Sequence, residues 1–202
     1  PGHNGGDGLV VARELHLAGV NVEIWCPFPI KETLTAQHLS HANWLGIPQI
    51  LAPPDIKNKA IWIDALFGLA QSRPLPEQIA ELFQARQLKR PGRLVSLDIP
   101  SGLCSDTGKP FHGGASFSSF TLTVGLIKRG LVQDLARQHV GDLVRIDLGF
   151  SSMFIDELSD SLPLSISSSD LSKITWPQPS LIASKYQRGR LLVVAGSHQY
   201  PG

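Results

Sequence analysis

RLVSLDIPSG, residues 93–102, is the stretch of this 202-residue chain that decides its fold. Its first six residues form a nearly continuous apolar run that ends in the acid Asp98. Pro100 then stiffens the turn, and Ser101 and Gly102 follow it. A short apolar run bounded by turn residues is typical of a strand buried on both faces, as in a parallel sheet. The stretch therefore predicts a buried parallel strand with a carboxylate at its carboxyl end.

Helix-like and strand-like segments alternate on both sides of this stretch. Helices are predicted where apolar residues recur at helical spacing, and strands where short apolar runs lie between polar residues. The predicted helices cover residues 7–18, 33–45, 76–88 and 132–139, and the predicted strands cover residues 21–26, 60–66, 93–98, 120–126 and 142–148. Apolar strands separated by helices imply a three-layer, Rossmann-like α/β fold, in which helices cover both faces of a mostly parallel sheet.

The composition of the sequence changes after Phe150. Residues 151–184 are rich in serine and are broken by three prolines, which predicts an interdomain linker. RLLVVAGS, residues 190–197, then predicts the first strand of another α/β domain. We therefore expect a domain over residues 1–150, a linker over 151–184 and the start of a second domain over 185–202. Because the chain lacks an initiator Met and stops just after a strand-like run, we expect a fragment cut at both ends.

Composition favours small-molecule chemistry. The chain has 18 Lys and Arg against 17 Asp and Glu, without charged blocks, so no nucleic acid or anionic membrane is expected as a partner. No apolar run approaches the ~20 residues of a membrane helix. Cys26 and Cys104 have no C-x-x-C spacing, which indicates buried thiols in a reducing, cytoplasmic compartment.

The first candidate site is the glycine-rich opening PGHNGGDGL, residues 1–9. It leads into the first predicted helix, and helix N-termini favour anions. However, a G-x-G-x-x-G spacing is absent, and Asp7 places a negative charge where a phosphate would lie. A simple phosphate cradle is therefore disfavoured. The alternative is that Asp7 only caps the helix while the glycines form a tight turn.

Two acids follow predicted strands, Asp64 in IWIDAL and Asp98 in LDIPSG. Ligands of open α/β sheets lie beyond the carboxyl ends of the strands, so these acids are expected near each other. With Asn4 and Ser101 they would offer converging oxygen atoms, which suit a hard cation better than zinc. The alternative for Asp64 is a carboxylate bonded to neighbouring backbone amides.

Four motifs, in this order along residues 1–150, resemble the NAD(P)H-hydrate epimerase domain. They are HNGGDG at residues 3–8, DALFGLAQSRP at 64–74, DIPSG at 98–102 and GLIKRGL at 125–131. The resemblance implies a repair activity. Water added at C6 of the nicotinamide ring gives R and S hydrates, NADHX and NADPHX, which such an epimerase interconverts.

Residues 185–202, KYQRGRLLVVAGSHQYPG, resemble the opening of the NAD(P)H-hydrate dehydratase domain, which has a ribokinase-like fold. In many bacterial proteins the two domains are fused in this order. The resemblance implies a bifunctional enzyme whose dehydratase domain, missing from this chain, uses ADP or ATP to restore the cofactor from the S hydrate. We also expect a homo-oligomer.

The resemblance also implies roles for individual residues. The hydrate would be bound by His3, Asn4, Gly5, Gly6, Asp7, Gly68, Leu69, Ala70, Gln71, Ser72, Arg73, Pro74 and Asp98. Lys128, in GLIKRGL, is expected to pair with the carboxylates or with a phosphate of the bound hydrate, and the alternative is a solvated loop lysine. A potassium ion would be held by Asn4, Asp64 and Ser101. Asp98 is the predicted general acid/base, because a strand-end carboxylate held by a rigid turn can reach the reacting oxygen. Its alternative role is hydrogen bonding to the ribose or to the nicotinamide amide.

Inversion at C6 can proceed by loss and return of the hydroxyl through an iminium-like species, or by ring opening. The sequence departs from the family pattern at His3, which replaces an Asn, and at Ala70, which replaces a Gly and is followed by Gln71 instead of Leu. Ala70 would be strained if its position needs a positive φ. These substitutions would permit a nucleotide-binding module without turnover. A protein scaffold is a further alternative, because epimerase-like domains of some lineages also serve as protein partners.

Overall fold

The structure is a computed structural model that describes residues 2–158, 162–164, 166, 168–175, 178–190 and 192. The chain forms two compact units, Pro1–Ser152 and Met153–Gly202. None of the helices within the described residues is long and apolar enough to cross a membrane.

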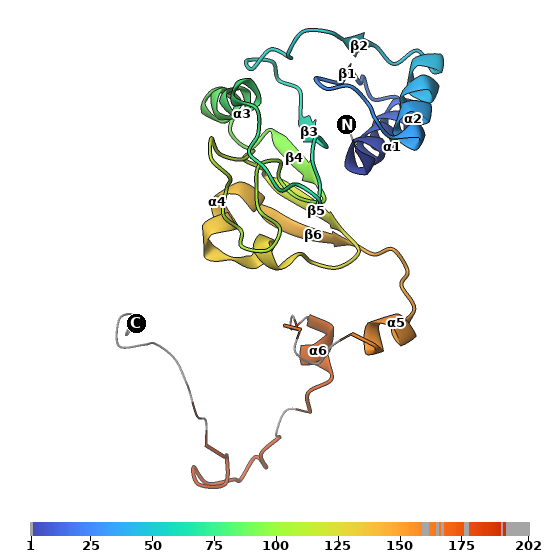
Figure 1. The fold of residues 1–202 in the computed structure, drawn as a ribbon. Helices are drawn as coiled ribbons and strands as arrows, with labels where there is room; N and C mark the ends of the chain where they lie inside the picture. The colour runs from blue at the N-terminus through green and yellow to red at the C-terminus, as the bar shows by residue number, and fades with distance from the viewer. Residues whose placement is uncertain are drawn as a thin grey trace. The chain divides into compact units, whose positions relative to one another are not determined.

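The first unit opens with two helices and two short strands (Figure 1). They are α1 (His3–Leu17), β1 (Ile24–Trp25), α2 (Thr33–Trp44) and β2 (Gln49–Ile50). The two strands are parallel. The helices α1 and α2 pack against each other, and their shared core consists of Leu9, Ala12, Ile24, Ala42 and Ile47. The two-residue strand β2 was not predicted, because it is too short to produce an apolar pattern.

A four-stranded parallel sheet forms the centre of this unit, in the order β3-β4-β5-β6. Its strands are β3 (Trp62–Asp64), β4 (Leu94–Leu97), β5 (Phe120–Val124) and β6 (Asp142–Ile146). Helix α3 (Glu77–Lys89) connects β3 to β4. Figure 1 shows α3 and α4 (Arg137–Val140) on one side of the sheet and α1 and α2 on the other. The mixed α/β fold with a parallel sheet flanked by helices is therefore confirmed.

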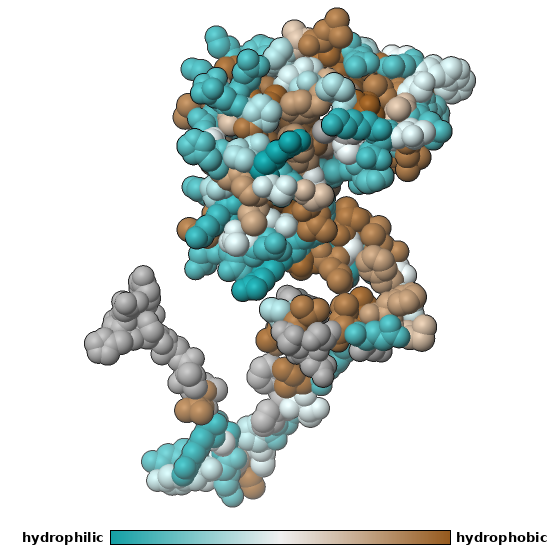
Figure 2. Space-filling model, in the orientation of Figure 1, coloured by the Kyte–Doolittle hydropathy of each residue, from teal (hydrophilic) through white to brown (hydrophobic). Residues whose placement is uncertain are grey.

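The two faces of the four-stranded sheet differ in burial. One face is buried and carries Ser96, Thr121 and Thr123, together with Leu94, which packs in a cluster with residues of α3. The other face is apolar and partly open in the described residues. Its exposed members are Ile63, Phe120, Val144 and Ile146. Figure 2 shows hydrophobic residues at the surface over the end of β6 and along the chain that follows it.

The continuous helix predicted over residues 132–139 is correct only for its last residues, which belong to α4. The chain instead forms two 3₁₀ turns, η1 (Arg129–Val132) and η2 (Asp134–Ala136), before α4. The first of these turns makes a close contact with another loop, because the Gly130 N–H donates to the Ser105 carbonyl at 2.6 Å. A Cβ atom at Gly130 would lie 2.4 Å from the Cys104 carbonyl oxygen. The loop around Cys104 therefore holds η1 close to its backbone.

Two short helices, α5 (Ser152–Asp156) and α6 (Ser168–Ser172), lie in the segment predicted as a linker. The strand predicted over residues 190–197 lies outside the described residues, apart from Arg190 and Leu192.

Candidate functional site

Helix α1 begins earlier than the sequence predicts. Its first residue is His3, so Asp7 lies in the second turn and the first turn holds no acid. The expectation that Asp7 caps the helix, and that its charge fills the first turn, is therefore wrong. The glycines do not form a tight turn either. A Cβ atom at Gly8 would lie 2.5 Å from the Ala65 side chain, so the absence of a side chain lets α1 approach the loop after β3.

Asn4, in the first turn of α1, bridges two loops. Its side-chain amide donates to the carbonyl of Phe67 at 2.9 Å and to that of Leu97 at 3.3 Å. Phe67 follows β3, and Leu97 is the last residue of β4. The Asn4 Oδ1 atom is buried and has no hydrogen-bond partner in the described part of the chain. The opening stretch and the two strand ends therefore converge, as the sequence predicts.

Asp64 is buried, with 3% of its surface exposed, and its carboxylate accepts five hydrogen bonds. Ser101 supplies two of them, from its hydroxyl to Oδ1 at 2.7 Å and from its backbone N–H to Oδ2 at 2.8 Å. The other donors are the hydroxyls of Ser96 and Ser116 and the backbone N–H of Leu66. From the sequence, the expected partners of Asp64 are backbone amides or a cation. It gave no signal for the hydroxyls of Ser96 and Ser116, because long-range packing brings them to Asp64.

The loop after β3 lies between α1 and the end of β4. A Cβ atom at Gly68 would lie 3.1 Å from Asn4 Cβ and 3.2 Å from Asp98 Oδ2, so both side chains flank Gly68. The backbone N–H of Leu69 donates to Asp98 Oδ2 at 3.2 Å. Ala70 has no positive φ, because Asp98 is the one non-glycine residue with a positive φ among those described. The strain that the sequence suggested at Ala70 is therefore absent.

The far end of this loop is joined to the turn after β4. The side-chain oxygen of Gln71 accepts from the backbone N–H of Gly102 at 2.8 Å, and its side-chain amide donates to the Arg73 carbonyl at 3.0 Å. Ser72, Arg73 and Pro74 are exposed. Gln71, which departs from the family pattern, therefore joins two of the motifs.

Asp98 has a strained backbone and a buried ion pair. Its φ is +66°, and the N–H of Ile99 bonds to the Leu97 carbonyl at 2.8 Å, which is the pattern of a γ-turn with a positive central φ. Such strain costs about 1–3 kcal/mol and is concentrated at active sites. The Asp98 carboxylate forms an ion pair with the Lys128 ammonium, and both side chains are at most 15% exposed. Lys128 also donates to the carbonyl of Val124 at 2.7 Å and to the hydroxyl of Thr123 at 3.2 Å.

Asp7 lies one helical turn beyond Asn4, at the exposed edge of this cluster. Partial burial raises the pKa of the Asp7 carboxyl, and the nearby charge of Asp98 raises that pKa further. The imidazoles of His3 and His38 act in the opposite direction. His3 itself lies on the exposed side of the helix, with its Nε2 atom 3.8 Å from a carboxylate oxygen of Glu32.

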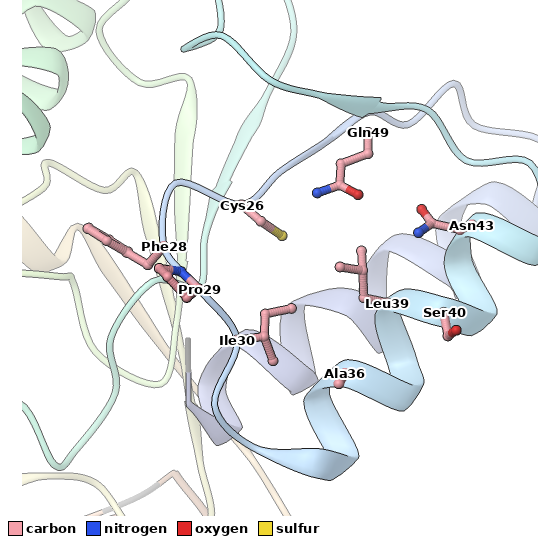
Figure 3. Close-up of a pocket in the computed structure, with 9 residues that line it drawn as sticks. All are labelled: Cys26, Phe28, Pro29, Ile30, Ala36, Leu39, Ser40, Asn43 and Gln49. Carbon is pink, nitrogen blue, oxygen red and sulfur yellow. The ribbon is translucent and has the colours of Figure 1, made fainter.

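A hollow of about 370 Å³ lies beside β1 and α2. Figure 3 shows that the side chains of Cys26, Leu39 and Gln49 point into the space between these elements. The Phe28 ring lines this hollow and packs 5.5 Å from the Phe67 ring, so the hollow lies next to the Asn4 contacts. A second hollow of about 390 Å³ lies beside α3 and is lined in part by Pro74. Asp98 lines neither hollow.

Within the described residues, no three His, Cys, Asp or Glu side chains gather in a way that would hold a metal ion. The candidate cation ligands Asn4, Asp64 and Ser101 offer oxygen atoms of three different kinds. The hydroxyl of Ser101 bonds directly to Asp64, and it accepts from the backbone N–H of Phe67 at 3.1 Å. Because the Phe67 carbonyl accepts from Asn4, the three candidates belong to one bonded network.

The fold and the converging loops define an α/β protein whose candidate site lies beyond the carboxyl ends of parallel strands. The chain belongs to the family described as YjeF-related protein N-terminus, whose sequence model matches residues 1–130.

Two groups of relatives are similar to this chain. The bifunctional NAD(P)H-hydrate repair enzyme Nnr of Gloeobacter violaceus is 39% identical over 208 residues, which cover 100% of this chain and 40% of the relative. The NAD(P)H-hydrate epimerase of Levilactobacillus brevis is 33% identical over 150 residues, which cover 73% of this chain and 69% of the relative. The chain therefore spans about two fifths of the length of the bifunctional relative.

A crystal structure of the yeast protein YNL200c has a similar fold. Its TM-score to this chain is 0.56, with 25% sequence identity, and the match covers 72% of this chain and 61% of the yeast chain.

Proposed function

We propose that this chain interconverts the R and S forms of NAD(P)H hydrate. The proposal is supported by the family membership and by the names of the relatives, one of which is an epimerase that the chain matches over most of its length. The observation that carries it is the strained Asp98, which is paired with Lys128 beside Asn4 and Gly68. Strain and a buried ion pair at a strand end suit a carboxylate that is held ready for chemistry.

The substrate would lie over the converging loops. The first turn of α1 presents unbonded backbone N–H groups and holds no acid, so it suits a phosphate of the nucleotide. The nicotinamide ring would lie beside Asn4 and Asp98, which both lie close to Gly68. The exposed residues from Leu69 to Pro74 would then contact the rest of the nucleotide.

The chemistry that we propose is loss and return of the C6 hydroxyl. A proton is delivered to this hydroxyl, the C–O bond breaks, and the lone pair of the ring nitrogen forms a double bond to C6. The oxygen leaves as water. Water then adds to the other face of the iminium ion and gives up a proton. The overall reaction therefore changes no oxidation state and consumes no proton. Asp98 exchanges a proton with the reacting oxygen.

We propose that potassium is held by Asn4, Asp64 and Ser101. The residues present fit a hard cation in two ways. Asn4 Oδ1 is a buried acceptor without a donor in the described residues. Asp64 is a buried carboxylate with no lysine or arginine in ion-pair distance among the same residues, and a cation there would replace some of the five hydrogen bonds that its oxygens accept. A bound potassium ion would supply positive charge that orders these loops and balances the substrate phosphates.

We propose further that the chain is part of a longer bifunctional enzyme, whose other domain is a dehydratase that uses ADP or ATP. The match to the bifunctional relatives supports this organisation. We also propose that the protein is cytoplasmic and that it forms a homo-oligomer.

The test is a conversion assay. Purified R hydrate is incubated with the full-length protein, with potassium or with sodium, and the S form is followed by chromatography. We expect faster conversion than without protein, and a loss of about 10²–10⁴-fold in kcat for Asp98→Asn. Asp106→Asn, an exposed aspartate outside the cluster, is the matched control. Binding without conversion would indicate a nucleotide-binding module, and no binding would indicate a scaffold. Either result contradicts the proposal.

A further inference from the structure

The loop after β3 contains a tight turn over residues 68–71. The turn is closed by a hydrogen bond from the backbone N–H of Gln71 to the carbonyl of Gly68 at 3.0 Å. Leu69 occupies the second position of this turn, and its backbone N–H donates to Asp98 Oδ2 at 3.2 Å. The first end of the turn also lies against Asp98, because a Cβ atom at Gly68 would be 3.2 Å from the same oxygen. The turn therefore presents one backbone N–H to the carboxylate that we propose as the general acid/base.

The side chain of Gln71 fixes the other end of the turn. Its oxygen accepts from the backbone N–H of Gly102 at 2.8 Å, and its amide donates to the carbonyl of Arg73 at 3.0 Å. One side chain thus joins the end of the turn to a second loop and also restrains the backbone that follows, as far as Arg73.

Gly102 is a rigid point of attachment. It is buried, and its carbonyl accepts from the backbone N–H of Phe111 at 2.8 Å. A Cβ atom at Gly102 would lie 2.4 Å from the carbonyl oxygen of Gly114 and 2.7 Å from the Cα atom of Ala115. Because the backbone of Gly102 is enclosed in this way, its bond with Gln71 restrains the loop after β3 and not the turn after β4.

We propose that Gln71 is a positioning residue, which holds residues 69–73 in the conformation that binds the hydrate before the hydrate arrives. This inference rests on the proposed epimerisation. Gln71 acts through the loop and not by its own contact with the hydrate, because both polar atoms of its side chain bond to the backbone. The leucine of the family pattern has no polar side-chain atom that could form either bond.

The benefit of a fixed loop lies in substrate binding. Arg73 is exposed, and its guanidinium forms no ion pair within the described residues. A guanidinium on a fixed backbone suits the phosphates of a nucleotide. A loop that is disordered without substrate must be ordered on binding, and this cost lowers the affinity. The side chain of Gln71 removes part of that cost in advance.

The test uses Gln71→Met in the full-length protein, because methionine has a similar length and cannot form either hydrogen bond. We expect KM for the hydrate to rise by about 3- to 10-fold while kcat stays within about twofold, because the loop is then ordered only on binding. Amide hydrogen exchange, followed by mass spectrometry without substrate, should become faster in the peptides that contain Leu69 and Gly102. Exchange in strand β5 should stay unchanged.

Gln84→Met is the matched control. Gln84 also bonds to a loop carbonyl, that of Gly113 at 3.2 Å, and neither residue belongs to the four motifs. This variant should keep the wild-type KM and the wild-type exchange at Leu69.

An unchanged KM in Gln71→Met overturns the inference, and so does a loss that is confined to kcat. Unchanged exchange at Leu69 also overturns it, because the turn would then be held without Gln71. If the wild-type protein does not convert the hydrate, the proposed function fails, whereas the exchange at Leu69 still shows whether Gln71 holds the loop.

Discussion

Asp98 and Lys128 form an ion pair in which the two side chains are 15% and 12% exposed. The pair joins the end of β4 to the loop after β5, two segments that are 30 residues apart in the sequence. Lys128 donates to two further acceptors, so its ammonium is fully bonded. Both charges are therefore fixed in place, and each depends on the other for compensation in a region of low solvent access.

Replacing Lys128 by Met should expose this dependence. The buried Asp98 carboxylate would lose its counter-charge, which costs about 3–5 kcal/mol in the free energy of unfolding. Urea unfolding measures this loss, and the conversion assay should show a lower kcat. Lys128→Arg keeps the charge and should lose less of both quantities. Equal stability of Lys128→Met and the wild type would mean that the ion pair is not maintained in solution.

The network around Asp64 predicts a large effect of Asp64→Asn. The five donors that now face a carboxylate would instead face an amide, whose NH₂ group is itself a donor. Each buried donor left without an acceptor costs about 1–3 kcal/mol. We expect a loss of about 3 kcal/mol or more by urea unfolding. Ser118→Ala, which alters a hydroxyl that bonds to Ser96 but not to Asp64, is the control and should lose less.

Two glycines of α1 should respond oppositely to alanine. A Cβ atom at Gly8 would overlap with Ala65, so Gly8→Ala should cost about 1–3 kcal/mol of stability. A Cβ atom at Gly5 would lie 3.8 Å from its nearest neighbour, the Ala65 carbonyl oxygen, so Gly5→Ala should add up to about 1 kcal/mol through helix propensity. Thermal unfolding distinguishes the two. Stabilisation by Gly8→Ala would show that α1 does not approach the loop this closely.

His139 should make stability depend on pH. Burial lowers the pKa of its imidazole, although the hydrogen bond between its Nδ1 and the Ser116 carbonyl, at 3.0 Å, opposes the shift. Because the folded state prefers the neutral ring, this stability is fully present above the unfolded pKa of about 6.5. It is lost as the pH falls from there through the lowered folded pKa.

The measurement is the urea midpoint between pH 8 and pH 5, compared with that of His139→Gln, which should depend less on pH. His112→Gln, at an exposed histidine, is the control and should keep the wild-type dependence. An identical pH dependence in His139→Gln and the wild type would contradict the assignment.

The sequence predicted the alternation of parallel strands and helices because apolar periodicity depends on local pattern alone. It also predicted that Asn4, Asp98 and Ser101 converge, since the carboxyl ends of parallel strands lie at one edge of a sheet. It placed the start of α1 too late, because glycine disfavours helices unless tertiary contact requires it, as the contact with Ala65 does at Gly8.

Long-range contacts explain what the sequence did not reveal. Arg86 lies on the buried side of α3, where its guanidinium donates to the carbonyls of Ile56, Asn58 and Ala60 and stacks 4.5 Å from the Trp62 ring. A charged residue in an amphipathic helix pattern predicts exposure to solvent. Only the carbonyl groups and the aromatic ring that Arg86 contacts in the folded chain explain its burial. Nothing in the sequence indicated the positive φ of Asp98 either. It belongs to the γ-turn in which the Ile99 N–H bonds to the Leu97 carbonyl.

The most direct measurement follows oxygen during turnover. Purified R hydrate is incubated with the full-length protein in H₂¹⁸O, the S product is isolated early, and its mass is compared with that of a sample without protein. If the C6 hydroxyl is lost and water returns on the other face, the enzymatic S product carries one ¹⁸O atom. An S product that retains ¹⁶O would contradict the proposed chemistry and indicate ring opening, and the absence of any accelerated formation of S would contradict the proposed function itself.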